Sequence, residues 1–379
     1  MSIIKKWIWQ HENYPNFNYN HSVLNDLLLE VSRNIGRLEG KVSVLNEKSI
    51  SSLLMDSSIE EILQSSQIEG EILSRESVKS SVRKKLDTTF DYNSDSSTRH
   101  TDGLVQLLLD SSYNSAPITQ ERLNGWHNIL FPSGYSDGHK IDVASYRCDE
   151  MEIVSSRGYR EIVHYIAPPH TKLTQEMNRF LDYVNNNSEE PFIKSAIAHL
   201  WFVTIHPYDD GNGRIARAIT NYILSKELGI KHKYFSLSTA IRKDKKGYYD
   251  GLEKSQNLFY NREFDFTKWI VWHTNMINRA IVLSLEMIEV VIQKTKFWDK
   301  ARDYTLNQRQ LKVLNKILDK GMEHFEGGLS TKKYASMSKT SIATAKRDIS
   351  QLIEYGLIKQ VDGSAGRNVR YLIHDINLN

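Results

Sequence analysis

The chain has 379 residues, of which 40% are hydrophobic, and its 49 lysines and arginines nearly balance 46 aspartates and glutamates. This is the composition of an ordinary globular protein with room for two or three domains, and it excludes a strongly acidic or basic chain. The single cysteine, Cys148, excludes an intrachain disulfide framework. The sequence has no basic-then-apolar leader and no apolar run of about twenty residues, so we expect a cytoplasmic protein without a membrane partner.

The first residues contain a cluster of aromatic side chains: Trp7, Trp9, Tyr14, Phe17 and Tyr19. We expect this cluster to serve in core packing, where it would hold a small helical domain against another part of the chain, and a peptide-binding face is the alternative. Residues 24–45, which follow it, have the periodicity of an amphipathic helix.

A further helix is predicted from about Ser57, because apolar residues then repeat at helical spacing. Gly70 is suited to the left-handed residue that ends a helix. Ser65 and Glu69 are four residues apart and therefore share one face of this helix. The polar residues 87–102 are predicted to be a loop or linker.

A β-hairpin is predicted where turn residues and β-favouring residues alternate, between Ala144 and Ile166. Ser155–Gly158 would form its tip, and a helix would follow over residues 172–184. The neighbouring histidines lie outside metal-ligand spacing, so we expect surface or packed side chains: His164, His170 and His199.

The most informative run extends from His206 to Arg217. Residues 191–205 form an apolar helix that must end near Pro207, which places His206 at its exit. A second helix is predicted to start near Asn212 or Gly213, with Asn212 as a good N-cap.

The residue types in this run suit phosphate chemistry. The first N–H groups of the second helix are free, and the glycines before it let an anion approach the backbone closely. Arg214 and Arg217 are three residues apart, so both guanidinium groups can reach one polyphosphate. Asp210 suits Mg²⁺, and neutral His206 can take a proton from a hydroxyl group.

The last eighty residues have a different character, with 14 lysines and arginines against 8 aspartates and glutamates. Helices are predicted at 307–318, 331–335 and 341–355, followed by two strands around the polar loop 362–367. This order is similar to a winged helix, whose third helix can enter the major groove of DNA. Protein docking or dimer formation is the alternative use.

The run from His206 to Arg217 resembles the signature of Fic-domain nucleotidyltransferases, H-x-F-x-D/E-G-N-G-R-x-x-R. The chain departs from it only at Tyr208, which stands for Phe. We expect Tyr208 to anchor the loop in the core as the family's Phe does. Asp209 occupies the variable position and is expected to be solvated.

The resemblance implies transfer of AMP from ATP to a Ser, Thr or Tyr hydroxyl of a target protein or of the chain itself, with loss of pyrophosphate. His206 would deprotonate the acceptor, and Asp210 would hold Mg²⁺. The remaining residues of the motif would bind phosphates, with the α-phosphate at the first three and the β- and γ-phosphates at the last two: Gly211, Asn212, Gly213, Arg214 and Arg217.

The upstream segment Ser65–Gly70 fits the inhibitory signature S/T-x-x-x-E-G/N of many Fic proteins. In that family the glutamate, here Glu69, pairs with the second arginine, here Arg217, and takes the place of the γ-phosphate. The chain would then belong to class II, which carries an N-terminal inhibitory helix. A solvated helix-end carboxylate is the alternative for Glu69.

Three domains are therefore expected: a helical domain at 1–105 with the inhibitory helix near 57–70, a Fic catalytic domain at 106–298, and a winged helix at 299–379. The fold would be mainly α-helical. By resemblance, the hairpin would be a flap on which the target protein docks, and a homodimer is expected.

By the same resemblance, three polar or aromatic residues after the motif are candidates to touch the nucleotide: Tyr248, Tyr249 and Asn257. The leading function is an autoinhibited protein adenylyltransferase. The alternative is a DNA-binding regulator whose Fic domain senses nucleotide or removes AMP from proteins.

Overall fold

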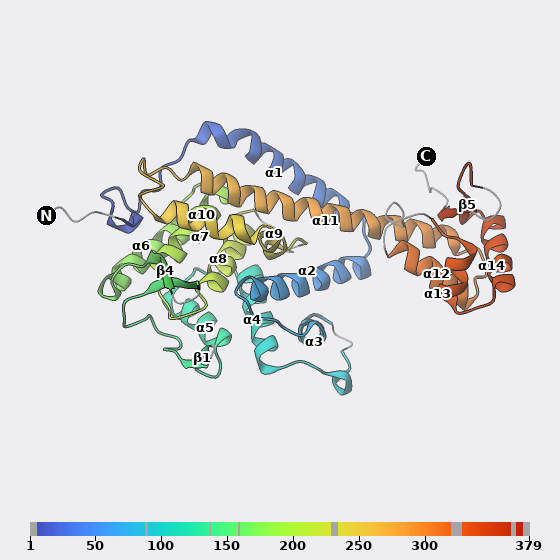
Figure 1. The fold of residues 1–379 in the computed structure, drawn as a ribbon, viewed down its shortest axis with the longest axis horizontal. Helices are drawn as coiled ribbons and strands as arrows, with labels where there is room; N and C mark the ends of the chain where they lie inside the picture. Colours follow the sequence, from blue (N-terminus) through green and yellow to red (C-terminus); the bar gives the residue numbers. More distant parts are fainter. Residues whose placement is uncertain are drawn as a thin grey trace. The chain divides into compact units, whose positions relative to one another are not determined.

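A computed structural model describes residues 6–87, 90–136, 138–157, 160–228, 234–319, 328–364 and 369–373. Within these residues the chain is mainly helical, as predicted, and its strands form small two-stranded antiparallel sheets (Figure 1). The chain divides into two compact units, Met1–Gly40 with Asn46–Ser284 and Lys41–Leu45 with Leu285–Asn379. The three predicted domain boundaries stay predictions. None of the described helices is both long enough and apolar enough to cross a bilayer.

The elements follow one another along the chain as η1 (Ile8–Gln10), α1 (His21–Val42), α2 (Glu47–Ile68), α3 (Arg75–Leu86), η2 (Tyr92–Ser94), α4 (Arg99–Tyr113), α5 (Gln120–Leu130), β1 (Tyr135–Ser136), β2 (His139–Lys140), β3 (Glu152–Arg157), β4 (Arg160–Ile166), η3 (His170–Lys172), α6 (Leu173–Asn186), α7 (Pro191–Ile205), α8 (Asn212–Glu227), α9 (Leu237–Lys243), α10 (Lys245–Gln256), α11 (Thr267–Ala301), α12 (Gln308–Leu318), α13 (Thr331–Ser338), α14 (Ile342–Glu354), β5 (Ile358–Gln360) and β6 (Tyr371–Ile373).

Helix α7 is the centre of the first unit. Every residue from Phe192 to Ile205 is buried, because the helix is apolar on all sides and is covered by neighbours such as α6 and α8. Pro191 occupies its first turn, where a missing N–H is tolerated, and the Glu190 carboxylate accepts from the N–H groups of Phe192 and Ile193. The helix ends at His206, as predicted.

The N-terminal aromatic cluster packs into the first unit, as predicted. Trp7 is 3% exposed and lies edge to face with Tyr165 at 5.3 Å between ring centroids. The indole N–H of Trp9 donates to the Ile166 carbonyl at 2.8 Å. These residues therefore fix the base of β4. The amphipathic helix predicted at 24–45 is α1, displaced by three residues at each end.

Helix α2 begins ten residues before the predicted start at Ser57. Its N-cap is Asn46, whose side chain accepts from the Ser49 N–H at 2.9 Å. The first half of α2 is rich in serine, so the apolar repeat is weak there although the cap is good. The predicted C-terminal end is confirmed, since Gly70 is left-handed with φ 91°. Helix α2 packs beside α3, α4 and α9.

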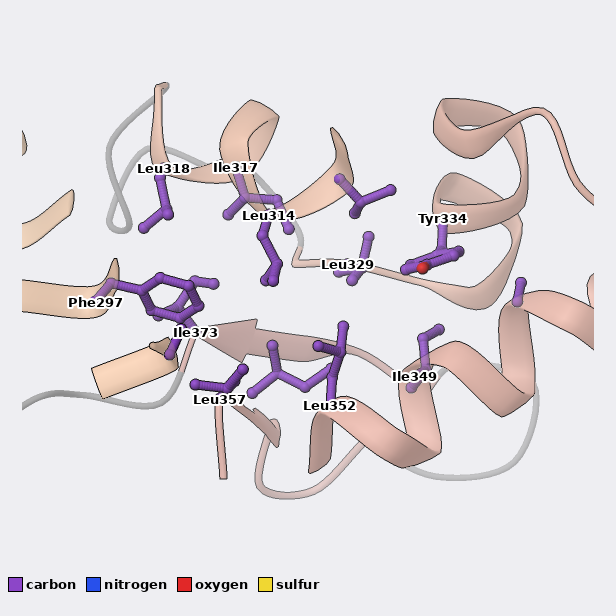
Figure 2. Packing of buried hydrophobic residues seen from close by; sticks show 14 of the residues in the cluster. Phe297, Leu314, Ile317, Leu318, Leu329, Tyr334, Ile349, Leu352, Leu357 and Ile373 are labelled. Atoms are coloured by element: carbon purple, nitrogen blue, oxygen red, sulfur yellow. The ribbon is translucent and has the colours of Figure 1, made fainter. Parts of the chain in front are cut away.

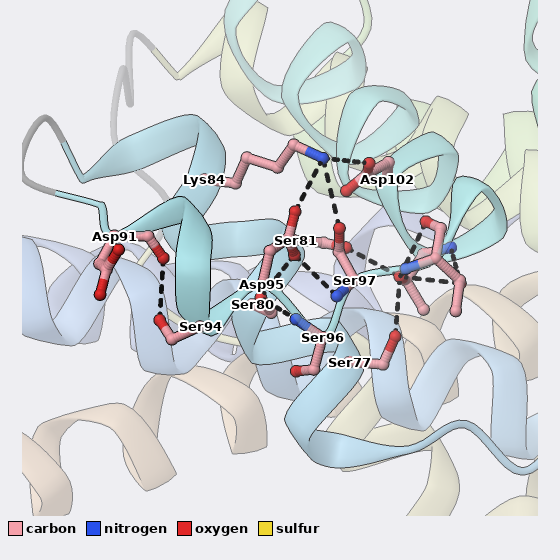
Figure 3. Close-up of polar contacts among 12 residues, drawn as sticks. Ser77, Ser80, Ser81, Lys84, Asp91, Ser94, Asp95, Ser96, Ser97 and Asp102 are labelled. Carbon is pink, nitrogen blue, oxygen red and sulfur yellow. Dashed lines mark hydrogen bonds and ion pairs between the residues drawn. The ribbon is translucent and has the colours of Figure 1, made fainter.

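The segment predicted as a loop or linker at 87–102 is bound to α3 rather than free. Lys84 of α3 reaches Asp102 at 2.8 Å and Asp95 at 3.3 Å, and the Ser80 hydroxyl donates to Asp95 at 2.9 Å (Figure 3). Residues 88–89 lie outside the described part. These polar side chains do not form an apolar core. They form a hydrogen-bonded network that joins α3 to α4.

The predicted hairpin is confirmed as β3 and β4, which pair in antiparallel register from Glu152 opposite Ile166 to Arg157 opposite Arg160. We call this hairpin the flap, and its role in docking a target stays a prediction. The predicted tip at Ser155–Gly158 is wrong at its first three residues, which continue the strand. Serine favours turns, but ladder hydrogen bonds use only the backbone. Residues 158–159, which connect the strands, lie outside the described residues.

The second unit contains the elements predicted at the C-terminal end: α12, α13, α14 and the β5–β6 hairpin. Their buried faces meet in one apolar core, where Leu314, Tyr334, Ile349 and Leu352 point toward one another (Figure 2). The predicted helix at 331–335 extends to Ser338. Of the predicted loop 362–367, residues 365–367 lie outside the described residues. Assignment of this unit as a winged helix stays a prediction.

Candidate active site

The turn between α7 and α8 brings the motif residues together. His206 ends α7 in a left-handed conformation with φ 51°, and Gly211 precedes α8 with φ 80°. A side chain at Gly211 would meet the Phe131 ring at 2.8 Å, so only glycine fits there. The chain therefore reverses within six residues, and the first N–H groups of α8 lie near His206 at one cavity.

Asn212 does not cap α8 as predicted. The N-cap is Gly211, and Asn212 is the first helical residue. Its side chain reaches back to Tyr208, accepting from the Tyr208 N–H at 3.1 Å and donating to the Tyr208 carbonyl at 2.7 Å. The amide thus closes the turn, because both its donor and its acceptor are used on one residue. The backbone N–H groups at the start of α8 stay available to an anion.

Tyr208 anchors this turn in the core, as predicted. It is 0% exposed, and its ring stacks on His127 with centroids 4.3 Å apart. Its hydroxyl, which the family's Phe lacks, donates to Asn124 Oδ1 at 2.8 Å. The substitution therefore leaves no buried hydroxyl unpaired. Asp209 is only partly exposed and accepts from the Asp142 N–H at 2.9 Å, so it is less solvated than expected.

His206 has the geometry of a base. Its Nδ1 lies 3.1 Å from the Val203 carbonyl, which can only accept, so Nδ1 carries the proton and Nε2 has a free lone pair. Burial lowers the pKa of His206 to about 4, which keeps the ring neutral at pH 7. A neutral imidazole with a fixed tautomer can take a proton from a bound hydroxyl group.

Arg147 supports this turn, a role that nothing in the sequence indicates beyond the place of this residue before the hairpin. The side chain is buried, and it donates to the carbonyls of His206 at 2.8 Å and of Asp149 and Pro168 at 2.6 Å each. Its own N–H donates to the Pro207 carbonyl at 2.9 Å. One guanidinium group therefore joins the end of α7 to the base of the flap.

His127 is the second supporting residue that sequence reasoning missed. Its Nδ1 accepts from the Ala144 N–H at 3.1 Å, so the other nitrogen, Nε2, carries the proton and donates to the Asp210 carbonyl at 3.2 Å. Burial lowers the pKa of His127 to about 4. A fully buried histidine in α5 has no distinguishing pattern in one sequence, because its partners lie 17 and 83 residues away.

Asp210 presents a carboxylate at the mouth of the site. Its side chain is 43% exposed; one oxygen accepts from the Gly211 N–H at 2.5 Å, and the other accepts from the Ser136 hydroxyl. Among the described residues no three histidine, cysteine or acidic side chains gather as a metal site. A single accessible carboxylate nonetheless fits Mg²⁺, which takes one or two carboxylates together with phosphate oxygens.

Arg217 meets both residues of the predicted inhibitory pair. Glu69 Oε1 lies 2.8 Å from Nη1, Nε donates to the Ser65 hydroxyl at 2.9 Å, and Nη2 donates to the Ser65 carbonyl at 3.0 Å. The arginine is 1% exposed. Glu69 also lies against Gly213, where a side chain would approach Oε1 to 2.3 Å. Glu69 is therefore a packed ion-pair partner and not a solvated carboxylate.

Arg214 has a carboxylate partner of its own, which sequence reasoning missed. Glu71 Oε2 accepts from its Nη1 at 3.1 Å, and Asp210 Oδ2 lies 3.9 Å from its Nη2. The guanidinium carbon also lies 5.0 Å from the centroid of the Phe131 ring. The other oxygen of Glu71 lies 2.7 Å from His100 Nε2. Both motif arginines are thus paired with glutamates that follow α2.

Several of these residues border a cavity of about 550 Å³ between the flap and the motif turn, but Arg214 and Arg217 are not among its lining residues. Its walls include the motif residues His206, Asp210, Asn212 and Gly213, the carboxylate of Glu69, flap residues, and aromatic and polar residues of α10: Tyr248, Tyr249 and Gln256. Tyr249 donates from its hydroxyl to the Ile68 carbonyl at 3.2 Å. Asn257, also predicted near the nucleotide, ends α10 and pairs with Trp7 in an isolated bridge.

Comparison with known proteins identifies the domain that carries this cavity. The model of the Fic/DOC family matches residues 117–224, from just before α5 to the last turn of α8. The chain contains a Fic/DOC domain. A second family model, described as a domain of unknown function (DUF4172), matches residues 7–88, which include α2 and Glu69. The Fic domain and the segment that supplies the glutamates are therefore matched separately.

Curated relatives of the Fic domain are transferases by name. The chain is 28% identical over 119 residues to a uridine 5'-monophosphate transferase of Xanthomonas campestris pv. campestris (strain 8004), which is 29% of this chain and 22% of that protein. It is 30% identical over 91 residues to the protein adenylyltransferase Fic of Nematostella vectensis, which is 23% of this chain and 19% of that protein. The chain thus spans about a fifth of each relative.

Solved structures share the fold over a longer stretch. A Fic family protein from Desulfovibrio desulfuricans G20 superposes with a TM-score of 0.53 at 19% identity, covering 93% of this chain and 97% of that one. A Fic domain containing signaling protein from Bacteroides thetaiotaomicron VPI-5482 has a TM-score of 0.52 at 16% identity, covering 69% and 97%. At these identities the likeness shows the fold alone.

Proposed function

We propose that the chain is an autoinhibited protein adenylyltransferase that moves AMP from ATP to a Ser, Thr or Tyr hydroxyl. The observation that carries this proposal is the placement of His206. Its neutral imidazole keeps Nε2 unprotonated and borders the cavity beside the free N–H groups of α8. A base next to an anion site is what transfer of a phosphorus group to a hydroxyl requires.

In the proposed reaction the acceptor oxygen bonds to the α-phosphorus of ATP while the bond from that phosphorus to the bridging oxygen breaks. Pyrophosphate leaves, and the hydroxyl proton passes to Nε2 of His206. The carbonyl of Val203 stabilises the imidazolium through Nδ1. Arg147 keeps the turn at His206 in place, so the base needs no rearrangement before it acts.

The nucleotide phosphates would lie along the start of α8. Gly211, Asn212 and Gly213 offer backbone at the α-phosphate, where the helix dipole favours negative charge. Arg214 and Arg217 would bind the β- and γ-phosphates through paired hydrogen bonds. Asp210 would hold Mg²⁺, which supplies charge neutralisation of the phosphate oxygens when it is bound.

The proposed brake is the ion pair of Glu69 with Arg217. The carboxylate lies 2.8 Å from Nη1, and the same guanidinium group is the proposed partner of the γ-phosphate of ATP. Burial alone would lower the pKa of Arg217, but the charge of Glu69 raises it above its ordinary value, so this pair is a favourable one. ATP must therefore compete with Glu69 for the same guanidinium group.

The target protein would dock on the flap. Strands β3 and β4 form a two-stranded sheet with no further strand paired to it among the described residues, and Val154, Ile162 and Val163 expose apolar side chains on it. An extended acceptor segment could add to such an edge through main-chain hydrogen bonds. Its hydroxyl would then lie above the cavity that His206 borders.

The test is incubation of the protein with α-labelled ATP and Mg²⁺, followed by intact mass and label on the protein itself. We expect an AMP adduct that is strong in Glu69→Gly, weaker in the native protein and absent in His206→Ala. The control His21→Ala changes an exposed histidine of α1 and should behave as the native protein. Parallel incubation with α-labelled UTP tests the nucleotide, since one relative is named for UMP.

Two results would contradict the proposal. Equal amounts of adduct in Glu69→Gly and in the native protein would contradict inhibition by Glu69. An adduct that persists in His206→Ala would contradict the assignment of His206 as the base. A cavity that binds nucleotide without any adduct would favour the alternative in which the Fic domain senses nucleotide or removes AMP from a protein.

A second candidate function, DNA binding by the second unit, is favoured by its charge distribution. Residues 328–347, which cover α13 and the start of α14, contain five basic and no acidic residues. Lys346 and Arg347 are exposed on α14. The next acid, Asp348, is buried and accepts from Arg309 at 2.8 Å and from Tyr334 at 3.0 Å, so its charge is neutralised inside. Helix α14 thus offers an uncompensated basic face to phosphates.

This candidate is tested by titrating a labelled random-sequence duplex with the full chain at two salt concentrations. We expect Lys346→Glu with Arg347→Glu to weaken binding at least about ten-fold, because two phosphate contacts become repulsions. Lys312→Glu with Lys316→Glu makes the same charge change on exposed positions of α12 and should keep most of the affinity. Equal losses of affinity in both double variants, or binding that does not depend on salt, would exclude α14 as the helix that contacts DNA.

A further inference from the structure

We propose that Glu71 is a second latch on the site, which holds Arg214 away from the nucleotide as Glu69 holds Arg217. This inference rests on the proposed function, because it concerns the phosphates of the same nucleotide. Its basis is the pairing of the two motif arginines with two carboxylates from one short segment. Glu71 would then set how readily the β- and γ-phosphates bind, independently of Glu69.

The backbone at the end of α2 directs the two carboxylates to neighbouring arginines. Gly70 is left-handed, and the Glu71 N–H donates to the Ser66 carbonyl at 3.0 Å, which closes the helix end. Glu69 lies on one side of this closure and Glu71 on the other. Because Arg214 and Arg217 are three residues apart on one face of α8, each carboxylate meets its own guanidinium group.

Arg214 depends on Glu71 for its charge compensation. Its side chain is 9% exposed, and Glu71 at 3.1 Å is nearer than Asp210 at 3.9 Å. Its Nε is buried and has no hydrogen-bond partner among the described residues. A buried cation with an unused donor is a good receptor for phosphate, but only after the carboxylate in front of it has moved.

His100 holds Glu71 from the other side. Its Nε2 lies 2.7 Å from Glu71 Oε1, and it belongs to the first turn of α4. Burial would raise the pKa of Glu71, but the hydrogen bond from His100 and the charge of Arg214 lower it below its ordinary value. The carboxylate is therefore ionised and held at both oxygens. Since α4 is joined to α3 by the network in Figure 3, Glu71 is supported by the helices around α2.

If Glu69 and Glu71 act as separate latches, their removal should have separate effects on ATP binding. Removing Glu69 frees Arg217 but leaves Arg214 paired, so Glu69→Gly releases only part of the brake. Removing the charge of Glu71 frees Arg214 while Glu69 stays in place. The two changes act on different guanidinium groups, and their effects on ATP affinity should combine. A nucleotide that lacks the β- and γ-phosphates should not respond to Glu71.

The experiment measures equilibrium binding of ATP and of AMP, with Mg²⁺, to the full chain. The proteins are native, Glu69→Gly, Glu71→Gln and the double variant. Glu71→Gln keeps the side-chain shape, and Glu71→Ala repeats the measurement if Glu71→Gln lowers the melting temperature. The matched control is Glu60→Gln, which removes a carboxylate of α2 from an arginine ion pair, with Arg75 at 2.5 Å, outside the site.

We expect Glu71→Gln to bind ATP about ten-fold more tightly than the native protein, which corresponds to ~1.4 kcal/mol, and AMP unchanged. The double variant should exceed either single variant, and Glu60→Gln should match the native protein. Unchanged ATP affinity in Glu71→Gln, or an equal gain for AMP, would overturn the second latch. Tighter ATP binding without transfer in any variant would support the latch while the proposed transferase fails. No ATP binding by any protein would overturn both.

Discussion

Arg147 shows how much of the site depends on a residue outside the motif. A left-handed conformation at a residue other than glycine costs about 1 kcal/mol, so His206 needs surroundings that hold it. Arg147 supplies them by donating to the His206, Asp149 and Pro168 carbonyls. These carbonyls are at the end of a helix and the base of a hairpin, and the bond to the Pro168 carbonyl is buried, so its loss would be costly.

Replacing Arg147 by lysine should therefore impair folding and transfer although the charge is kept. A lysine ammonium is a compact point donor and cannot span three carbonyls that a planar guanidinium reaches together. We expect a loss of about 2 kcal/mol in the free energy of unfolding and a fall in transfer at saturating ATP. Thermal unfolding and label incorporation measure the two effects.

The control for this change is Arg179→Lys. Arg179 is a half-exposed residue of α6 whose ion pair with Glu176 spans 3.6 Å. It should unfold and react as the native protein does. Native-like stability in Arg147→Lys would show that the turn at His206 is held by other contacts.

The sequence predicted those site residues that lie within one continuous motif and missed those that reach it from elsewhere. Roles could be proposed for His206, Asp210, Arg214 and Arg217 because their residue types and spacing indicate phosphate chemistry. Glu69 was found through a second local pattern. His127, Arg147 and Glu71 have no such pattern, because each contacts at least one site residue that lies 59 to 143 positions away. Only a folded chain brings such pairs together.

At the scale of elements, α2 is held along the face that carries Ser65 and Glu69. One turn earlier, buried Glu61 accepts from the Ser236 hydroxyl at 2.8 Å, the Ser238 N–H at 3.0 Å and the Ser238 hydroxyl at 2.6 Å. Because these positions are four residues apart, the contact with α9 and the contact with Arg217 lie on one stripe of α2. Glu69 therefore projects from a fixed helix, which suits the proposed competition with phosphate.

Element prediction succeeded where apolar periodicity or a strong terminator was present. Helix α7, the end of α2 at Gly70 and the order of elements in the second unit were predicted on these grounds. The start of α2 was missed because capping by Asn46 precedes a serine-rich turn in which the apolar repeat is weak. The tip of the flap was misplaced because serine favours turns locally. The pairing of β3 with β4 instead depends on contacts between residues that are apart in the sequence.

At the scale of the whole molecule, buried histidines make the stability of the first unit depend on pH. Burial lowers the pKa of His127 and His206 to about 4 and that of His273 to about 3, and it lowers that of His199 well below the ordinary value. An unfolded histidine has a pKa of about 6.5. Below that pH the unfolded chain binds protons that the folded chain excludes, so stability falls as pH drops from 6.5 toward 4.

His273 isolates this effect because it lies outside the proposed mechanism. It is 0% exposed, neither ring nitrogen has a hydrogen-bond partner among the described residues, and its ring lies 5.5 Å from that of His199. His273→Phe keeps a ring of similar size and cannot titrate. At pH 5 the variant should retain on the order of 1 to 2 kcal/mol that the native protein has lost relative to pH 7.

The measurement is the melting temperature of both proteins at steps between pH 7 and pH 5. Carboxylates titrate near pH 4 in the unfolded chain, so they contribute little in this window. We expect a shallower pH slope in His273→Phe, whereas His139→Gln, at an exposed histidine of β2, should follow the native protein. Parallel slopes in all three proteins would mean that His273 takes up its proton in the folded state as readily as in the unfolded chain. A charged imidazolium would then have to lie in the core around α7 and α11, where the described residues offer His273 no hydrogen-bond partner.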